Sequence, residues 1–263
     1  MNNLKVKNHL VQWLSQKLKR SGLNGFVVGV SGGIDSALTS TLCAETGAPL
    51  IVVNMPINQN PTHISRSDEH IHWLTSRYDN ISSHVVDLGE TFESFCDQMP
   101  SEALGGFSLA NTRSRLRMMA LYAFANSHNM LVVGTGNKVE DYGVGFFTKY
   151  GDGGVDISPI ADLLKSEVYE MSSYLEIIQS IQDATPNDGL WDDGRSDEDQ
   201  IGATYAELEW ALEFYDTHRA KWTSEELSAR EAEVMKIYLD RHFLNKHKLE
   251  APPTCEVPEE IKQ

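Results

Sequence analysis

The sequence predicts an α/β protein, with a doubly wound parallel five-stranded sheet, helices on both faces and a mainly helical C-terminal part. Short apolar runs alternate with stretches of helical periodicity up to about residue 164, which is typical of a parallel sheet. Glycine-rich turns follow two of these runs directly. After residue 164 only helical periodicity remains. We therefore expect a single domain over 1–263, divided into an α/β core at about 1–164 and a mainly helical part at about 165–263.

The expected strands are short and rich in Val, Ile and Leu, as buried strands of parallel sheets are. They lie at Phe26–Val30, 49–53, 83–87 and 130–134, with a short fifth at 155–157. Helices are expected between and after them, from their apolar spacing and from proline and glycine breakers. Their ranges are 4–20, 36–45, 63–77, 89–99, 112–126, 165–178, 204–215 and 224–241. Thr223 and Glu226 would form a capping box for the last helix, and 183–199, rich in Asp, Gly and Pro, is expected to be a loop.

Composition limits the class of protein. The chain has 263 residues, a hydrophobic fraction of 41% and no apolar run long enough to span a membrane. Its N-terminus lacks the apolar segment of a signal peptide. Its three cysteines form neither a C-x-x-C motif nor an even set, so we expect a reducing, cytoplasmic location and no zinc site. The net charge of −16 argues against a nucleic-acid partner, because phosphate binding requires a basic face.

The turn after the first expected strand indicates a phosphate site. It consists of Gly29, Val30, Ser31, Gly32, Gly33, Ile34, Asp35 and Ser36. Backbone N–H groups at a helix N-terminus attract anions, and glycines let a phosphate approach the backbone. Asp35 would repel a phosphate unless it binds a bridging divalent cation. The turn lacks the lysine of a Walker A loop. The alternative is a structural turn of small residues, which gives Asp35 no role.

A second block follows the expected fourth strand. It runs from Gly134 to Glu140 and then from Gly145 to Asp156 through Phe-Phe-Thr-Lys-Tyr-Gly-Asp-Gly-Gly. Because the carboxyl ends of parallel strands lie at one edge of the sheet, both blocks should face the same ligand.

The Ser31–Ser36 loop resembles the SGGxDS loop of the PP-loop ATP pyrophosphatases. Together with GTGNKVE, FFTKYGDGGVD, SPIADLLKSEV, SDEDQIG and the late His247-Lys248, it makes the chain similar to ammonia-dependent NAD synthetases over about residues 5–250. The resemblance implies the adenine nucleotide alpha hydrolase-like fold, a homodimer and Mg²⁺ with ATP. It also implies amidation of deamido-NAD by ammonia to NAD, through an adenylated carboxylate and without a covalent protein nucleophile. The chain begins almost at the synthetase region, so we expect ammonia to come free or from a separate partner.

The resemblance also assigns residues. ATP would contact the Gly29–Ser36 loop, Thr135, Lys165 and Asn187, and the metal would bind to Asp35 and Glu140. Deamido-NAD would contact Arg117, Arg115, Lys149, Asp156, His247 and Lys248, the last two across a dimer interface. The segment from Glu140 to Lys149 is one residue longer than is usual in the family, so Asp141 is the alternative metal ligand. Asn187 stands where many relatives have Thr.

Several alternatives stay open at this point. Any one of Arg113, Arg115 and Arg117 could contact the substrate, with Arg117 preferred and Arg115 second. The chain could instead be a GMP-synthetase-like subunit, a tRNA-thiolating enzyme, or a nucleotide sensor on the same fold, since a fold alone does not assign function. The charge and the absence of a cysteine pair disfavour tRNA thiolation, and the FTKYGDGG block disfavours a GMP synthetase. A sensor would not require Asp35, Lys149 and Lys165.

Overall fold

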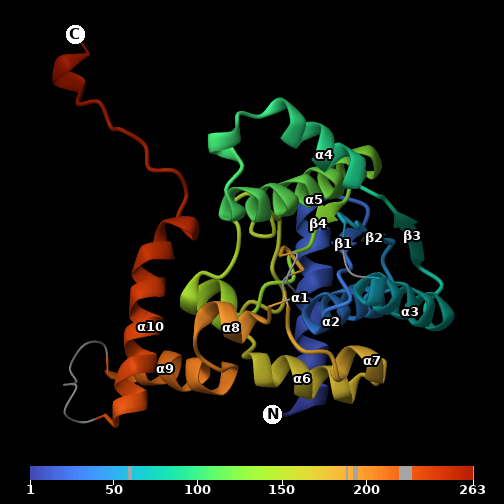
Figure 1. The fold of residues 1–263 in the computed structure, drawn as a ribbon. Helices are drawn as coiled ribbons and strands as arrows, with labels where there is room; N and C mark the ends of the chain where they lie inside the picture. Colours follow the sequence, from blue (N-terminus) through green and yellow to red (C-terminus); the bar gives the residue numbers. More distant parts are fainter. Residues whose placement is uncertain (59–60, 188, 192–194, 219–226, 263) are drawn as a thin grey trace.

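The computed structural model describes residues 1–58, 61–187, 189–191, 195–218 and 227–262. A parallel sheet lies at its centre, with strands in the order β3-β2-β1-β4 (Figure 1). The strands are β1 (Phe26–Gly29), β2 (Leu50–Asn54), β3 (Ile81–Val85) and β4 (Leu131–Val132). Phe26 is in register with Leu50 on one side and with Leu131 on the other. All carboxyl ends of the strands therefore lie at the same edge, where the sequence predicted the ligand site.

Helices alternate with the strands as predicted. The first five are α1 (Asn3–Ser21), α2 (Ile34–Glu45), α3 (Pro61–Arg77), α4 (Gly89–Gln98) and α5 (Gly106–His128). After the sheet come α6 (Lys165–Tyr174), α7 (Gln179–Gln182), α8 (Asp197–Ile201), α9 (Tyr205–His218) and α10 (Ala229–Asn245). Short 3₁₀ turns lie at Ser101–Ala103 (η1), Lys246–Lys248 (η4) and Glu259–Ile261 (η5), and a π-helix, η2, spans Lys138–Val144.

Both faces of the sheet are covered, which explains why the strand sequences are apolar without alternation. Phe26 and Val28 pack with Leu38 of α2 and Met171 of α6 on one face. Val27, between them, packs with side chains of α4 and α5 on the other face. Figure 1 shows α4 and α5 on one side of the sheet and α2 and α6 on the other. The predicted fold class is confirmed.

A third cluster of buried side chains belongs to the C-terminal part. Val139 and Val144 of η2 pack against Leu208 of α9 and against Val234 and Met235 of α10. The π-helix thus connects the sheet edge to the helical part. The single-domain organisation with a division near residue 164 stays a prediction. None of the described helices combines the length and the apolar composition that crossing a membrane requires.

The predicted fifth strand is wrong, because the part of the chain that the structure describes forms a sheet of four strands. At 155–157 only one isolated parallel bridge forms, between Val133 and Ile157. The cause lies in Asp156, whose Oδ2 accepts the Val132 N–H at 2.8 Å. The Asp156 carboxylate thus accepts the hydrogen bond that a backbone carbonyl of a fifth strand would otherwise accept from Val132. The ladder of backbone hydrogen bonds therefore ends here.

Some helix boundaries differ from the predictions for local reasons. The helix predicted over 165–178 ends at Tyr174, and Glu176 has a φ of 55°, which interrupts it before α7. The last helix begins at Ala229, with a capping box formed by Ser228 and Glu231. The predicted capping box at Thr223 and Glu226 lies outside the described residues. Part of the predicted 183–199 loop is helical, because Ser196 caps α8.

Candidate active site

The turn between β1 and α2 has the geometry of an anion site. Gly32 has a φ of 80°, a conformation that favours glycine. The Ser36 hydroxyl donates to the Gly33 carbonyl at 3.0 Å and accepts the Ser31 N–H at 3.2 Å, so the turn is held by its own side chains. The N-cap residue of α2 is Gly33, which has no side chain that could cap the helix. N–H groups at this end can therefore meet a phosphate.

A cavity of about 240 Å³ opens above this turn, at the carboxyl ends of β1, β2 and β4. All eleven residues predicted to bind ATP line it: Gly29, Val30, Ser31, Gly32, Gly33, Ile34, Asp35, Ser36, Thr135, Lys165 and Asn187. Arg117, Glu140 and Asp141 line it as well. The structure thus assembles the two sequence blocks around one cavity, although their roles toward ATP stay predictions.

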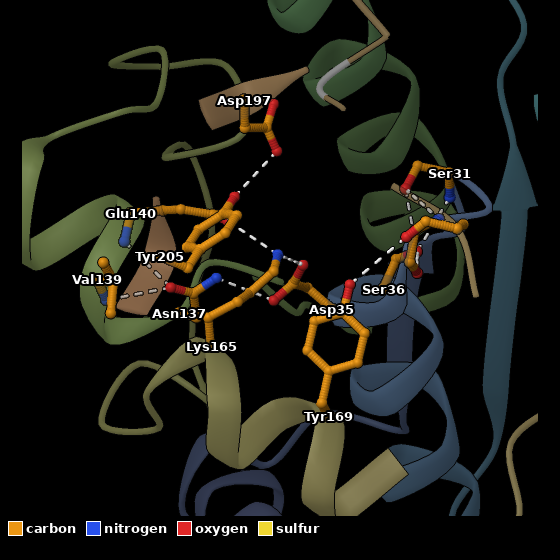
Figure 2. A network of polar contacts seen from close by, with 12 residues as sticks. Ser31, Asp35, Ser36, Asn137, Val139, Glu140, Lys165, Tyr169, Asp197 and Tyr205 are labelled. Atoms are coloured by element: carbon orange, nitrogen blue, oxygen red, sulfur yellow. Dashed lines mark hydrogen bonds and ion pairs between the residues drawn. The ribbon is translucent and has the colours of Figure 1, made fainter. Parts of the chain in front are cut away.

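The polar centre of the cavity is the ammonium group of Lys165. Its Nζ lies 2.6 Å from Asp35 Oδ2 and 2.8 Å from Glu140 Oε1 (Figure 2). Only 3% of the Lys165 side chain is exposed. Burial alone would lower the pKa of Lys165, but the two carboxylates raise it above its ordinary value. The lysine therefore stays charged in the cavity.

The Asn137 side chain connects the Asp35 carboxylate to the backbone of Glu140. Its Nδ2 donates to Asp35 Oδ1 at 3.0 Å. Its Oδ1 accepts the N–H groups of Val139 and Glu140, each at 3.1 Å, so the same side chain caps the π-helix that carries Glu140. Asn137 is fully buried. One side chain therefore fixes the distance between the first block and the second.

The π-helix explains the extra residue between Glu140 and Lys149. A π-helix forms where one additional residue is accommodated within helical turns, often at a functional site. The turn at Lys138–Val144 spans the place where the sequence analysis located the insertion. Glu140 keeps its contact with Lys165, while Asp141 faces Gly136, where an added Cβ would lie 1.8 Å from Asp141 Oδ2.

The environments of Glu140 and Asp141 differ. Burial raises the pKa of Asp141 well above its usual range, and three neighbouring carboxyl groups raise it further. Burial also acts on Glu140, but Lys165 and hydrogen bonds from its neighbours outweigh it and lower the pKa of Glu140. Burial also raises the pKa of Asp35, so the choice of Glu140 rests on geometry: Glu140 shares the Lys165 ammonium with Asp35.

Sequence reasoning missed two residues of this centre, Tyr205 and Asp197. The Tyr205 hydroxyl makes a short hydrogen bond to Glu140 Oε1 and also lies 3.0 Å from Asp197 Oδ2 (Figure 2). The Lys165 Nζ lies 4.9 Å from the centre of the Tyr205 ring. The signal was available in the SDEDQIG block, which contains Asp197 and ends shortly before Tyr205.

The three candidate arginines occupy different places. Arg117 lines the cavity and its Nε donates to the Met55 carbonyl at 3.1 Å. Arg113 is buried, donates to the Leu190 carbonyl at 2.8 Å and stacks over Phe92. Arg115 lies outside the cavity lining, with its Nη2 3.3 Å from the Lys149 carbonyl. Arg66, which the sequence analysis did not identify, also lines the cavity.

The other residues predicted to contact deamido-NAD do not line this cavity. Lys149 Nζ donates to the carbonyls of His247 and Glu250, at 2.6 and 2.9 Å. Lys248 Nζ donates in return to the carbonyls of Gly145 and Phe147, at 2.9 and 2.8 Å. The predicted substrate loop and the C-terminal turn η4 thus hold each other within one chain.

Asp156 is separate from these groups. Its carboxylate accepts hydrogen bonds from the Val132 N–H and, at 3.0 Å, from the Tyr122 hydroxyl. The His247 ring bonds to the Leu244 carbonyl of its own helix end. Contacts of these residues with deamido-NAD stay predictions.

The donors at the centre fit Mg²⁺. Asp35 and Glu140 contact the same ammonium group, so their oxygens can reach a common cation. Carboxylate oxygens are the ligands that Mg²⁺ prefers, and this ion usually takes only one or two from the protein, with the rest from water and phosphates. Among the described residues, no group of three or more acidic, His or Cys side chains is placed to hold a metal.

Comparison with known proteins decides the family. A family model described as NAD synthase matches residues 6–252. The chain belongs to the NAD synthase family. The NH₃-dependent NAD⁺ synthetase of Syntrophomonas wolfei is 36% identical to it, and the alignment covers 100% of each chain. This membership confirms the family predicted from the sequence and the predicted function, that of a ligase that forms NAD with ammonia.

Solved structures of the family have the same fold. The NMN synthetase of Francisella tularensis gives a TM-score of 0.83 at 33% identity, covering 98% of this chain and 100% of that one. The NH₃-dependent NAD synthetase of Campylobacter jejuni gives 0.78 at 26% identity, covering 97% and 100%. Membership of the NAD synthase family sets aside the GMP-synthetase-like, tRNA-thiolating and sensor alternatives.

Proposed function

We propose that this NAD synthase binds ATP with Mg²⁺ in the cavity above β1, adenylates the nicotinate carboxylate of deamido-NAD and transfers the acyl group to ammonia. The observation that carries this proposal is the arrangement of Asp35, Glu140 and Lys165 over the phosphate-type turn. Two carboxylates for a metal and one ammonium for phosphates are the charges that a bound ATP–Mg²⁺ complex requires.

The chemistry explains why ATP is needed. A carboxylate is a poor acyl donor because its oxygen is a poor leaving group. A nicotinate oxygen forms a bond to the α-phosphorus, and the bond from that phosphorus to pyrophosphate breaks. The ammonia nitrogen then bonds to the carbonyl carbon, a proton is lost, and the bond to AMP breaks. The products are NAD, AMP and pyrophosphate.

The protein supplies position and electrostatics in this sequence, not a covalent nucleophile. N–H groups of the Ser31–Ser36 turn and the Lys165 ammonium would hold the phosphates of ATP. Mg²⁺ bound to Asp35 and Glu140 would offset the negative charge of those phosphates. Arg117, on the cavity wall, would attract the carboxylate or a phosphate of the acceptor.

The acceptor site would extend from the cavity toward the Lys149 loop. Gly151 and Val155 of this loop line the cavity, whereas Lys149 and Asp156 of the same loop do not. Lys149 and Lys248 are bonded to carbonyl groups. These acceptors are neutral, so the hydrogen bonds fix the positions of the two ammonium groups and do not cancel their charge. Such positive charges suit an anionic dinucleotide.

The experiment that tests this proposal measures both products. The protein is incubated with deamido-NAD, ATP, Mg²⁺ and ammonium, and AMP and NAD are quantified by chromatography. We expect equal amounts of the two. AMP without NAD, or neither product, would contradict the proposed reaction. Replacement of ammonium by glutamine, with the same protein, shows whether ammonia must be supplied free.

A second acceptor is favoured by one observation. The Francisella protein, whose structure is similar over nearly the whole chain, is described as an NMN synthetase. The same chemistry would then act on nicotinate mononucleotide, which lacks the adenylate half of deamido-NAD. Comparing kcat/KM for the mononucleotide and for deamido-NAD decides between the two acceptors. If kcat/KM is higher for the mononucleotide than for deamido-NAD, the mononucleotide becomes the proposed substrate.

We also propose that the protein acts as a homodimer in the cytoplasm. Large apolar side chains are exposed on α5 and at the end of α10, among them Phe107 at 78% and Leu244 at 74%, which would be covered in a dimer. The proposed location rests on the odd number and wide spacing of Cys43, Cys96 and Cys255, which form no C-x-x-C motif. Light scattering tests the first point: a mass of one chain at micromolar concentration would contradict it.

A further inference from the structure

The Lys165 ammonium has the same partners that a divalent cation would need. Its Nζ donates to Asp35 Oδ2 and to Glu140 Oε1, and it lies 4.9 Å from the centre of the Tyr205 ring. With 3% of its side chain exposed, little of the group faces water. The positive charge of this site therefore comes from the chain itself.

The two carboxylates are held in place by other residues. Asn137 donates to the second oxygen of Asp35, and the Tyr205 hydroxyl bonds to Glu140 (Figure 2). Because these contacts fix both groups, the space between them does not widen easily. An ammonium and a divalent cation cannot both sit there, since two positive charges a few ångströms apart repel strongly in a site of low dielectric.

Lys165 also has a place to move. It is the first residue of α6, joined to the helix by a long and flexible side chain. The positive end of the helix dipole disfavours an ammonium there, whereas an adjacent phosphate favours it. The turn predicted to hold phosphates lines the same cavity as Lys165. A bound triphosphate would therefore attract the ammonium away from the carboxylates.

We propose that Lys165 is a tethered counter-ion that keeps divalent cations off Asp35 and Glu140 until ATP draws it onto its phosphates. The inference rests on the proposed function in taking ATP as the ligand of this cavity. Without nucleotide, the ammonium neutralises the carboxylates and the metal binds weakly. With nucleotide, the ammonium transfers to the phosphates and the carboxylates become metal ligands. The metal therefore enters with ATP and not before it.

A purely structural salt bridge makes a different prediction. If Lys165 only stabilises the fold, its removal leaves two carboxylates that are unpaired and destabilising, with no gain in metal affinity. If Lys165 competes with the metal, its removal increases metal affinity in the absence of nucleotide. The two cases therefore differ in whether removal of Lys165 increases the metal affinity measured without nucleotide.

The test uses Mn²⁺ as the probe and electron paramagnetic resonance of free Mn²⁺ as the readout, so that no turnover is required. Wild type, Lys165→Met and Lys138→Met are titrated without nucleotide. Lys138 is the matched control, because its ammonium pairs with Asp162 at 2.9 Å near the same π-helix but touches neither Asp35 nor Glu140. We expect Lys165→Met to bind one Mn²⁺ at least tenfold more tightly than wild type and the control.

A second readout is thermal unfolding. Mn²⁺ that binds only to the native state raises its melting temperature. We expect millimolar Mn²⁺ to raise it in Lys165→Met and to leave it nearly unchanged in wild type. In wild type, Mn²⁺ should bind weakly without nucleotide and tightly once a non-hydrolysable ATP analogue is added.

The outcomes are distinct. A folded Lys165→Met chain without increased Mn²⁺ affinity would overturn the proposal, as would wild type binding Mn²⁺ equally well with and without the analogue. If Lys165→Met is unfolded in metal-free buffer, Mn²⁺ should fold it where KCl of equal ionic strength does not, and failure to do so contradicts the proposal. If Lys165→Met binds Mn²⁺ more tightly but the wild-type protein forms no AMP in the activity assay, the inference stands and the proposed reaction is contradicted.

Discussion

Asn137 offers the most direct test of how the site is held together. Its side chain makes three hydrogen bonds, one to Asp35 and two to the first N–H groups of the π-helix, and it is fully buried. Replacing it with alanine removes all three bonds and leaves the Asp35 oxygen and two N–H groups without these partners. We therefore expect Asn137→Ala to destabilise the fold and to loosen both carboxylates of the centre.

The magnitude follows from the two kinds of bond. Loss of an N-terminal cap costs about 1 kcal/mol. Loss of a hydrogen bond to a charged group costs about 1.5–3 kcal/mol. Together they give a loss of about 3 kcal/mol in the free energy of unfolding, which in a protein of this size lowers the melting temperature by about 6–12 °C.

Urea unfolding followed by circular dichroism measures this loss, with two further variants for comparison. Asn8→Ala is the control, since Asn8 is exposed on α1, and should change stability by less than about 0.5 kcal/mol. Asn137→Asp keeps acceptors for the cap but places a third carboxylate beside Asp35, so it should lose stability at neutral pH and regain part of it as the pH falls. An Asn137→Ala chain as stable as Asn8→Ala would refute this account of the site.

Three further predictions concern single side chains. Asp35→Asn should abolish most turnover while the circular dichroism spectrum stays native, because it removes a metal ligand but keeps the shape; an unchanged kcat would dismiss the metal role. Lys149→Ala should raise the KM for the acceptor more than that for ATP, whereas the exposed Lys246→Ala should alter neither; an effect on ATP alone would contradict the assignment. Burial lowers the pKa of His70 to about 3, well below its unfolded value, so the unfolded state takes up a proton first as the pH falls. Stability from this group should be complete above about pH 6.5 and be lost toward pH 3, and His70→Gln should flatten that part of the pH–stability curve; an identical curve for the variant would show that another group is responsible.

The order of elements could be predicted from the sequence because each signal is local. Apolar runs bounded by glycine and proline gave the four strands, and the alternation of strand and helix gave the parallel sheet. The Gly29–Ser36 turn, together with Thr135, Lys165 and Asn187, accounts for the eleven residues predicted to bind ATP, and all of them line one cavity. Local patterns suffice here because parallel strands bring their carboxyl ends to one edge whatever lies between them.

The prediction of a fifth strand failed for a reason that is not local. The 155–157 segment has a strand-like composition, but Asp156 uses its side chain to occupy the Val132 N–H. Whether a carboxylate or a carbonyl accepts that bond depends on where the preceding glycine turns place the chain. Likewise, the sequence left Arg113, Arg115 and Arg117 open with a preference for Arg117, and the packing of α5 places Arg117 at the cavity and buries Arg113.

The sequence by itself predicted the family and, through that resemblance, the reaction, since motifs such as Ser31–Ser36 are encoded over a few consecutive positions. Only the tertiary structure decided which charges meet: that Lys165 lies between Asp35 and Glu140, that Asn137 spans both blocks, and that Tyr205 supports Glu140. These contacts join residues up to 130 positions apart. Their energies depend on burial and on distances of a few ångströms, which the packing of α6 and α9 against the sheet edge sets and no local pattern contains.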